Sequence, residues 1–180
     1  NVLNTDFVAL IKDDDTIRGL KIIQDGEETL LKNGVSKSDV SKMKDLFGPS
    51  GICNIIGAIK MAKYLKLGPN DNIVTIATDS FDRYESVLED LETRYLETEN
   101  FVLDRWFIDV FRKNGEEDVV DFRTEDRKQQ LFLQKEKDWL KFGYKKTYLD
   151  QMKSMDFWDK EYEKIEHYNQ MIKELRSNES

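Results

Sequence analysis

The apolar positions in the first half of the chain alternate between short continuous runs and helical spacing. Residues 6–11 (DFVALI) and 72–78 (NIVTIAT) are runs of strand length, and the second is almost unbroken and rich in β-branched residues, as is typical of a buried parallel strand. Apolar residues recur at helical spacing in residues 13–23, 36–47, 51–66 and 84–95. This alternation predicts an α/β fold with a partial, open and mostly parallel sheet and flanking helices.

Polar residues and glycines mark where several of these helices begin and end. The acids Asp13–Asp15 precede the first helix and suit its positive end, and they lack the alternate spacing of a calcium loop. Ser36 is placed to cap the helix over residues 36–47. Residues 26–34 (GEETLLKNG) predict a short helix or turn that Gly34 closes.

The second half of the chain is predicted to consist mostly of amphipathic helices, with a short strand near Val119 (VVDF). One apolar stripe consists of Leu103, Trp106, Phe107, Val110 and Phe111, and another of Trp158, Tyr162, Ile165, Tyr168, Ile172 and Leu175. All three tryptophans lie in this half, so it buries apolar surface in its own core, against the first half or in a dimer. We therefore expect an α/β domain over residues 1–97 and a helical extension over residues 98–180.

Composition and charge narrow the classes of partner and compartment. The 180 residues fit one ordinary domain, or one domain plus an appendage, and the net charge is −8. Nucleic acid and anionic membrane surfaces are not expected partners, because phosphate binding needs clustered Lys and Arg. A membrane-spanning helix is not expected either, because no apolar run approaches the necessary length of about 20 residues. The single cysteine indicates a reducing, cytoplasmic location. Because the first residue is Asn, we expect the chain to be part of a longer polypeptide.

Two small polar turns stand where an α/β fold would place a ligand. The turn Thr78–Ser80 follows the predicted strand, and the loop Gly48–Gly51 opens a predicted helix. Ligands of open α/β sheets bind beyond the carboxyl ends of the parallel strands, so the two turns would form one wall of a pocket. Structural alternatives stay open, with Ser50 as a helix N-cap and the turn after the strand as a simple chain reversal.

The same two segments carry a resemblance to a known family. Residues 47–62 (FGPSGICNIIGAIKMA) are similar to the Gly-Ile-Ser-Ser-Gly-Ala-Asn segment and following helix of cysteine synthases. Residues 72–88 (NIVTIATDSFDRYESVL) resemble the strand, turn and Arg-Tyr pair of that family, in the same order and at a fitting spacing. The resemblance covers about Asp6 to Leu91 and is to pyridoxal-phosphate enzymes of the tryptophan-synthase-β fold type. It implies β-elimination or β-replacement on an amino-acid substrate by a homodimeric lyase or transferase.

The resemblance also implies a role for the residues of the two turns. Ser80 matches the hydroxyl residue that bonds the pyridine nitrogen of pyridoxal 5'-phosphate, and a neutral partner there favours chemistry at the β-carbon. Gly48, Ser50 and Gly51 match the loop that lines the cofactor and substrate pocket, where small residues let the backbone approach closely. Asp79, beside Ser80, is expected either to contact the cofactor or to form the turn.

Other parts of such an enzyme are not found in the sequence. The family anchors its cofactor on an N-terminal lysine and in a glycine-rich phosphate loop, and the resemblance implies that both belong to a missing N-terminal part of the same enzyme. The chain alone is then expected to be inactive and to hold no catalytic residue. Lys60 is the alternative cofactor lysine, but Lys60, Lys63 and Lys66 recur every third residue, as on a solvated helix face.

The remaining reactive side chains favour structural roles, and two other functions stay open. The only histidine, His167, lies far from Cys53 in the sequence, so we interpret Cys53 as a packed residue and His167 as a surface residue. One alternative function is a helical interaction or dimerisation module on a scaffold without catalysis, which predicts a chain that binds no cofactor. The other is a different α/β enzyme, which predicts affinity for a nucleotide or a sugar phosphate.

Overall fold

The structure is a computed structural model that describes residues 2–80, 82, 84–95, 98–113, 115 and 117–178. The chain divides into two compact units: unit 1 comprises Asn1–Val8 and Val120–Ser180, and unit 2 comprises Ala9–Val119. The expected division between residues 97 and 98 does not coincide with this one, because residues 98–119 belong to unit 2. Unit 1 is thus built from both ends of the chain, and unit 2 from the continuous segment between them.

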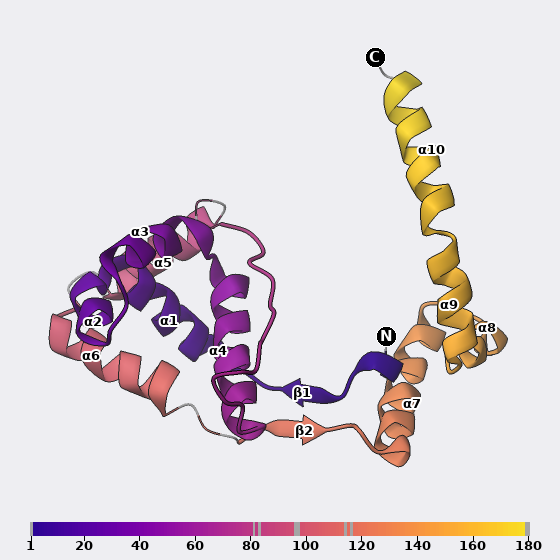
Figure 1. Cartoon of the computed structure of the whole chain (residues 1–180), viewed down its shortest axis with the longest axis horizontal. Helices are drawn as coiled ribbons and strands as arrows, with labels where there is room; N and C mark the ends of the chain where they lie inside the picture. Colours follow the sequence, from indigo (N-terminus) through magenta and orange to yellow (C-terminus); the bar gives the residue numbers. More distant parts are fainter. Residues whose placement is uncertain are drawn as a thin grey trace. The chain divides into compact units, whose positions relative to one another are not determined.

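Unit 2 consists of short helices packed around one core. Its helices are α1 (Asp13–Asp25), α2 (Glu27–Lys32), α3 (Lys37–Leu46), α4 (Pro49–Tyr64), α5 (Glu85–Tyr95), α6 (Asn100–Phe107) and the π-helical turn Ile108–Arg112 that continues α6 (Figure 1). The buried core consists of Leu20, Ile22, Ile23, Leu30, Val40, Ile52, Ile56, Leu103 and Val110. The helices expected in the first half from the spacing of apolar residues are therefore confirmed.

Local interactions explain where several of these helices begin and end. The Ser36 side chain accepts a hydrogen bond from the Asp39 backbone N–H at 3.2 Å, which confirms the predicted N-cap of α3. Asp13–Asp15 occupy the first turn of α1, where negative charge interacts favourably with the helix dipole. Gly34, which follows α2, has a φ of 93°, a left-handed conformation that favours glycine and ends the helical segment as predicted.

Close packing of α1 against α4 lies at the centre of unit 2. A Cβ atom at Gly19 on α1 would lie 2.8 Å from Cγ2 of Ile52 on α4, so glycine allows this approach. Ile52 and Ile56 are fully buried, and each contributes about 1.5–3 kcal/mol by leaving water. The predicted stripe from Leu103 to Phe111 also packs in this core, so it belongs to unit 2 and not to a separate extension.

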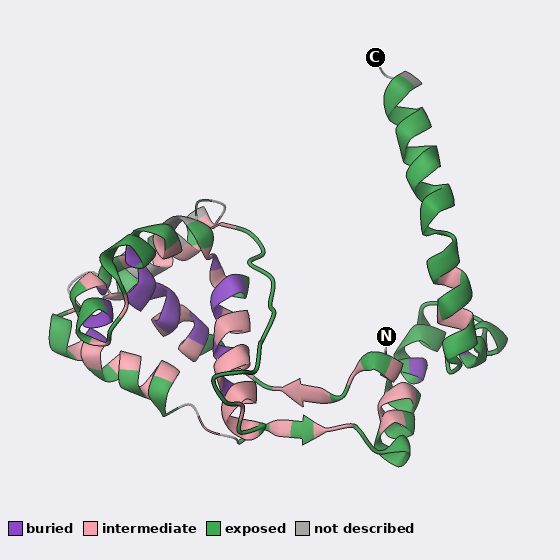
Figure 2. Ribbon diagram, in the orientation of Figure 1, coloured by how far each residue is buried: buried purple, intermediate pink, exposed green. Residues whose placement is uncertain are grey.

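The run of residues 72–78 is not the buried parallel strand that the sequence predicts. It is exposed and has no regular secondary structure, with Val74 93% exposed and Ile76 71% exposed (Figure 2). The one sheet among the described residues pairs β1 (Phe7–Ala9) with β2 (Val119–Asp121) in an antiparallel arrangement.

The expected α/β fold, with an open, mostly parallel sheet and flanking helices, is therefore wrong. A β-branched run becomes a strand when a neighbouring strand accepts its backbone hydrogen bonds. Residues 72–78 have no such neighbour within the part of the chain that the structure describes. The short strand expected near Val119 is confirmed, and β1 lies within the expected run of residues 6–11.

Unit 1 is helical, as the sequence predicts for the end of the chain. Its elements are the 3-10 turn η1 (Val2–Asn4) and the helices α7 (Glu125–Lys141), α8 (Lys146–Gln151), α9 (Met155–Glu163) and α10 (Ile165–Asn178). The N-terminal segment packs on α7: Val2 is buried, and Lys128 Nζ donates to the Leu3 carbonyl oxygen at 2.8 Å (Figure 1). No helix among the described residues is long and apolar enough to cross a membrane.

Candidate functional site

The fold of unit 2 brings the two predicted turns together. The Gly48 backbone N–H donates to the Asp79 carbonyl oxygen at 2.9 Å. A Cβ atom at Gly48 would lie 2.6 Å from that oxygen and 3.2 Å from the Ser80 carbonyl oxygen, so the two backbones meet where only glycine fits. We call the loop Gly48–Gly51 together with Asp79 and Ser80 the corner.

Three polar side chains of the corner are partly or fully open to solvent. Ser50 and Asp79 are exposed and Ser80 is half-buried. The Tyr84 hydroxyl donates to Asp79 Oδ2 at 3.3 Å, and the Ser80 hydroxyl donates to the Asp82 carboxylate. These contacts hold the turn after residue 78 in shape, so Asp79 and Ser80 act as turn formers whether or not they also meet a ligand.

The start of α4 corrects one expectation and explains another. The N-cap of α4 is Gly48, with no side-chain cap, and Ser50 lies inside the first turn, so the N-cap alternative for Ser50 is wrong. Gly51 is buried, and a Cβ atom there would lie 3.0 Å from Cδ1 of Phe47. Pro49 begins the helix at a position where its missing N–H costs no hydrogen bond. The glycines of this loop therefore serve close packing.

Lys60 is not part of a solvated helix face. Lys60 is only 4% exposed, and its Nζ donates a hydrogen bond to the Leu10 carbonyl oxygen at 3.0 Å. Lys63 likewise donates to the carbonyl oxygens of Phe111 and Arg112, at 3.3 and 2.7 Å. Lys60 lies about three helical turns along α4 from the corner. Its amine therefore links α4 to the segment before α1, and it is not placed to hold a cofactor at the corner.

A groove with a volume of about 310 Å³ runs along α4 in unit 2. It is lined by Ala9, Ile11, Cys53, Asn54, Gly57, Ala58, Met61, Ile73, Val74 and Thr75. Cys53 is half-buried in this lining, so part of it faces the groove. The groove is not evident from the sequence, although Cys53, Gly57 and Ala58 place three small residues on one face of α4. Spacing alone cannot tell a small residue under a neighbouring helix from one under open space.

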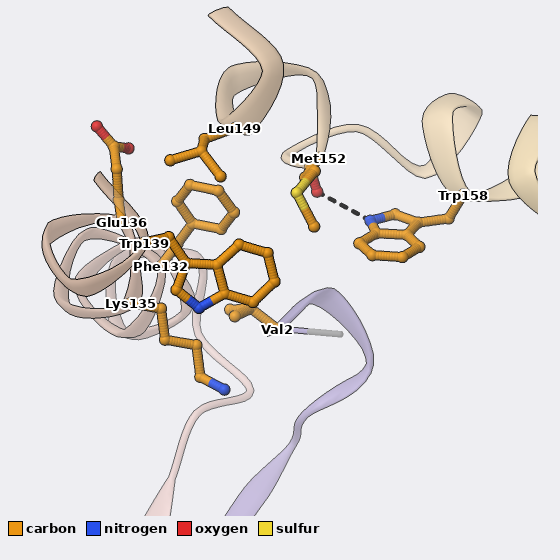
Figure 3. Close-up of a pocket in the computed structure, with 8 residues that line it drawn as sticks. All are labelled: Val2, Phe132, Lys135, Glu136, Trp139, Leu149, Met152 and Trp158. Atoms are coloured by element: carbon orange, nitrogen blue, oxygen red, sulfur yellow. Dashed lines mark hydrogen bonds between the residues drawn. The ribbon is translucent and has the colours of Figure 1, made fainter. Parts of the chain in front are cut away.

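Unit 1 contains a smaller apolar cavity, which Figure 3 shows between η1 and the helices α7, α8 and α9. Its lining residues are Val2, Phe132, Lys135, Glu136, Trp139, Leu149, Met152 and Trp158. Trp158 Nε1 donates to the Met152 carbonyl oxygen at 2.9 Å, which fixes the indole at one edge of the cavity. The cavity volume of about 80 Å³ is well below the ~300 Å³ of ordinary ligand pockets, so a molecule of the size of pyridoxal phosphate does not fit.

A cluster of charged side chains beside this cavity links α7 to α8. Glu136 is only 7% exposed, and its Oε1 accepts from Lys146 Nζ at 2.6 Å while Lys153 Nζ lies 3.2 Å from Oε2. The hydrogen bond from Lys146 holds the pKa of Glu136 below its ordinary value, and the same bond raises the pKa of Lys146. Each charge has an opposite partner, so the cluster is explained as a structural link between helices.

Metal chemistry finds no support in the described part of the chain. No group of three or more His, Cys, Asp or Glu side chains there is arranged to hold a metal ion. His167 is exposed on α10, as expected of a surface residue. Comparison with known protein families, curated proteins and solved structures finds no match for this chain. Function is therefore inferred from the sequence and from the geometry of the corner, the groove and the exposed helices.

Proposed function

We propose that this chain supplies one wall of the cofactor pocket in a pyridoxal-phosphate enzyme that performs β-elimination or β-replacement on an amino acid. The adjacency of Gly48 to Asp79 and Ser80 supports this proposal. The resemblance assigns both turns to the cofactor, and they are distant in sequence yet joined by a backbone hydrogen bond of 2.9 Å. Two polar turns meeting at one surface are what such a wall requires.

The groups at the corner have distinct roles in this proposal. Gly48 and Gly51 hold the corner together, because the Gly48 backbone meets the carbonyl oxygens of Asp79 and Ser80 and Gly51 packs against Phe47. Ser80 offers a neutral hydroxyl to the ring nitrogen once that hydroxyl turns from the Asp82 carboxylate, with which it is now bonded. Pyridoxal phosphate supplies the electron sink for β-carbon chemistry when it is bound, and Ser80 tempers that sink because it cannot protonate the ring.

In this proposal the described residues contact only the ring of the cofactor. The amine of Lys60 is bonded to the Leu10 carbonyl oxygen, so it is not available to anchor the cofactor. We therefore assign the anchoring lysine and the phosphate site to polypeptide outside this chain, and we expect the isolated chain to be inactive. In this proposal the complete enzyme is a cytoplasmic homodimer.

The test uses the protein isolated from its natural source, together with any polypeptide joined to it or associated with it. We expect the visible absorbance of bound pyridoxal phosphate, and we expect Ser80→Ala to weaken cofactor binding about tenfold, the equivalent of one hydrogen bond worth about 1.4 kcal/mol. Asp82→Asn, which keeps the hydroxyl of Ser80, should retain the cofactor. Ser41→Ala on the exposed side of α3 is the matched control. A natural protein without bound cofactor, or a Ser80→Ala protein with unchanged absorbance and turnover, would refute the proposal.

A second candidate function is a helical interaction module, which the exposed face of α10 favours (Figure 2). The face consists of Ile165, Tyr168, Ile172 and Leu175, which are 44%, 49%, 46% and 63% exposed. Their spacing alternates between three and four residues, as in a coiled coil. A second copy of the chain is the partner with matching chemistry. If α10 pairs with the α10 of a second copy in the antiparallel direction, Tyr162 of one copy lies opposite Arg176 of the other. No residues of like charge lie opposite one another in this arrangement.

The oligomeric state tests this second function. Sedimentation equilibrium is expected to show a dimer, and Ile172→Lys is expected to convert it to a monomer, because a charge at this position must stay hydrated. Gln170→Lys places the same charge on the opposite face of α10 and should leave the dimer intact. A wild-type chain that stays monomeric over the whole concentration range would exclude this function for α10.

A further inference from the structure

Two extended segments line the groove along α4. One is the end of β1 with the residues that follow it, represented by Ala9 and Ile11, and the other is Ile73–Thr75. The helix α4 itself contributes the rest of the lining. Figure 1 shows the trace of residues 66–80 running beside α4 without regular secondary structure. A groove lined by two extended backbones differs from an ordinary pocket, because its walls carry rows of peptide groups.

The backbone of the second wall is almost free of partners. Within residues 72–78 the Ile76 carbonyl oxygen accepts from Asn54 Nδ2 at 2.9 Å, and the described part of the chain provides no other hydrogen bond to these residues. An extended segment with unpaired N–H and C=O groups is a template for a further strand. The run is also uncharged and β-branched, a composition typical of strands.

The wall formed by the end of β1 also has backbone groups that face away from β2. The Leu10 N–H donates to the Asp118 carbonyl oxygen at 3.0 Å, on the side where β2 pairs with β1. Backbone groups of successive residues in a strand point to opposite edges, so those of Ala9 and Ile11 point away from β2. An added strand at this edge would continue the existing two-stranded sheet.

The surface of α4 in the groove is shaped for close approach. A Cβ atom at Gly57 would meet no atom within 4 Å, so no residue of the described chain explains why glycine stands there. Glycine inside a helix costs about 1 kcal/mol relative to alanine. Gly57 is flanked in the lining by Cys53 and Ala58, and all of the lining residues are uncharged. The groove therefore matches an occupant that is apolar or neutral and that brings its own backbone close to the helix.

We propose that this groove binds a β-strand of another polypeptide. The strand pairs its backbone with residues 73–78 and lays uncharged side chains over Gly57 and Ala58, so that the exposed Ile73 and Val74 become covered. The recognition is the addition of a strand, in which main-chain hydrogen bonds provide affinity and alternate side chains provide specificity. The proposal stands on the groove alone and does not rest on the cofactor.

The same segment of a second copy is not the occupant. In each copy the segment is fastened to its own α4 by the bond between Asn54 and Ile76. Two such segments paired edge to edge would leave the surface over Gly57 open in both copies. The occupant is therefore a separate strand whose two edges are both available, with small or apolar side chains and no charge facing the helix.

The experiment uses the full chain and a defined probe, a fluorescein-labelled peptide with the sequence of residues 72–78, blocked at its carboxyl end. Fluorescence anisotropy is expected to show saturable binding without pyridoxal phosphate. A peptide with proline in place of its central threonine lacks one N–H and should bind at least about tenfold more weakly. Gly57→Leu places its Cβ where no atom lies within 4 Å and adds its side chain to the groove, so it should weaken binding by a similar factor. Gly68→Leu adds the same side chain outside the groove and is the matched control.

Each outcome decides the proposal. Circular dichroism must show the helical content of the wild type in the Gly57→Leu chain, and Ala58→Leu serves as a second blocking variant. Loss of binding in both blocking variants, with binding kept by Gly68→Leu, is the expected result. The proposal is overturned if the wild-type chain shows no saturable binding, if the blocking variants bind as well as the wild type, or if the proline peptide binds equally. Because no cofactor is present, failure here leaves the pyridoxal-phosphate proposal for the corner unaffected.

Discussion

The same substitution at two glycines of one helix is predicted to have opposite effects. Gly48 is the N-cap of α4, and Gly57 lies in its interior. In Gly48→Ala the new Cβ would lie 2.6 Å from the Asp79 carbonyl oxygen and 2.9 Å from Cε2 of Tyr84, so backbone must shift. In Gly57→Ala the new Cβ meets nothing within 4 Å. Alanine at position 48 therefore tests the contact between the two backbones of the corner. Alanine at position 57 tests helix propensity alone.

The magnitudes follow from these contacts. Gly48 has φ −86° and ψ −174°, an extended conformation open to any residue, so the cost at this position comes from the clash and from the weakened hydrogen bond to Asp79. Overpacking costs about 1–3 kcal/mol, and one hydrogen bond contributes about 1 kcal/mol. Gly57→Ala is expected to stabilise α4 by up to about 1 kcal/mol. Gly48→Ala should thus cost about 2–4 kcal/mol, and the two variants should differ by about 2–5 kcal/mol in local stability.

Hydrogen exchange read by mass spectrometry measures this difference segment by segment, so it does not require the two units to unfold together. Peptides from α4 should exchange roughly thirtyfold to several-hundredfold faster in Gly48→Ala, since about 1.4 kcal/mol corresponds to a factor of ten. The same α4 peptides should exchange more slowly than in the wild type in Gly57→Ala. Equal exchange in the two variants, or no change in Gly48→Ala, would show that the backbones of Gly48 and Asp79 are not in contact.

Three further predictions concern a hydrogen bond, a charge cluster and the exposed segment. Thr29→Val removes the 2.5 Å hydrogen bond from Thr29 Oγ1 to Asp104, which is the main reason that the pKa of Asp104 lies below 3.8. The Asp104 carboxyl resonance should therefore titrate at higher pH in this variant, and unit 2 should lose less stability on acidification. An unshifted titration would contradict this hydrogen bond. Because the pKa of Glu136 is lowered from 4.5, chiefly by Lys146, its charge stabilises unit 1 above that pH and this stability is lost as pH falls below it. Glu136→Gln should abolish that part of the acid sensitivity in hydrogen exchange of α8, and an unchanged pH profile would count against the cluster. Val74 is 93% exposed, so Val74→Lys should change the free energy of unfolding by less than about 0.5 kcal/mol. The added charge should also reduce self-association measured by light scattering. A marked loss of stability would mean that Val74 is packed.

The parts of the fold that the sequence predicts correctly depend on local interactions. Ser36 caps α3 through a bond to a residue three positions away, and Asp13–Asp15 act on the dipole of their own helix. Gly34 closes α2 through its own φ angle. Such signals lie within one or two turns of chain, so the pattern of residues is enough to find them.

The errors concern partners that are distant in sequence. The β-branched run 72–78 has the composition of a buried strand, but burial needs a neighbouring strand that the described chain does not provide. Lys60 has the spacing of a solvated face, yet its amine is bonded to the carbonyl oxygen of Leu10, fifty positions away. The contact between Gly48 and Asp79 is expected from the sequence, because both turns match one family. The hydrogen bond from Ser80 to Asp82 is not predicted by any feature of the sequence.

The discontinuous make-up of unit 1 has a consequence for biosynthesis. A ribosome makes Val2 and Leu3 before unit 2, but their binding surface on α7 emerges only after all of unit 2 has been made. Closing so long a loop carries an entropic cost that unit 2, with its core drawn from one continuous stretch, does not bear. A nascent chain that has released all of unit 2 while α7 is still inside the ribosome would therefore hold an assembled unit 2, while Val2 and Leu3 remain open to proteases.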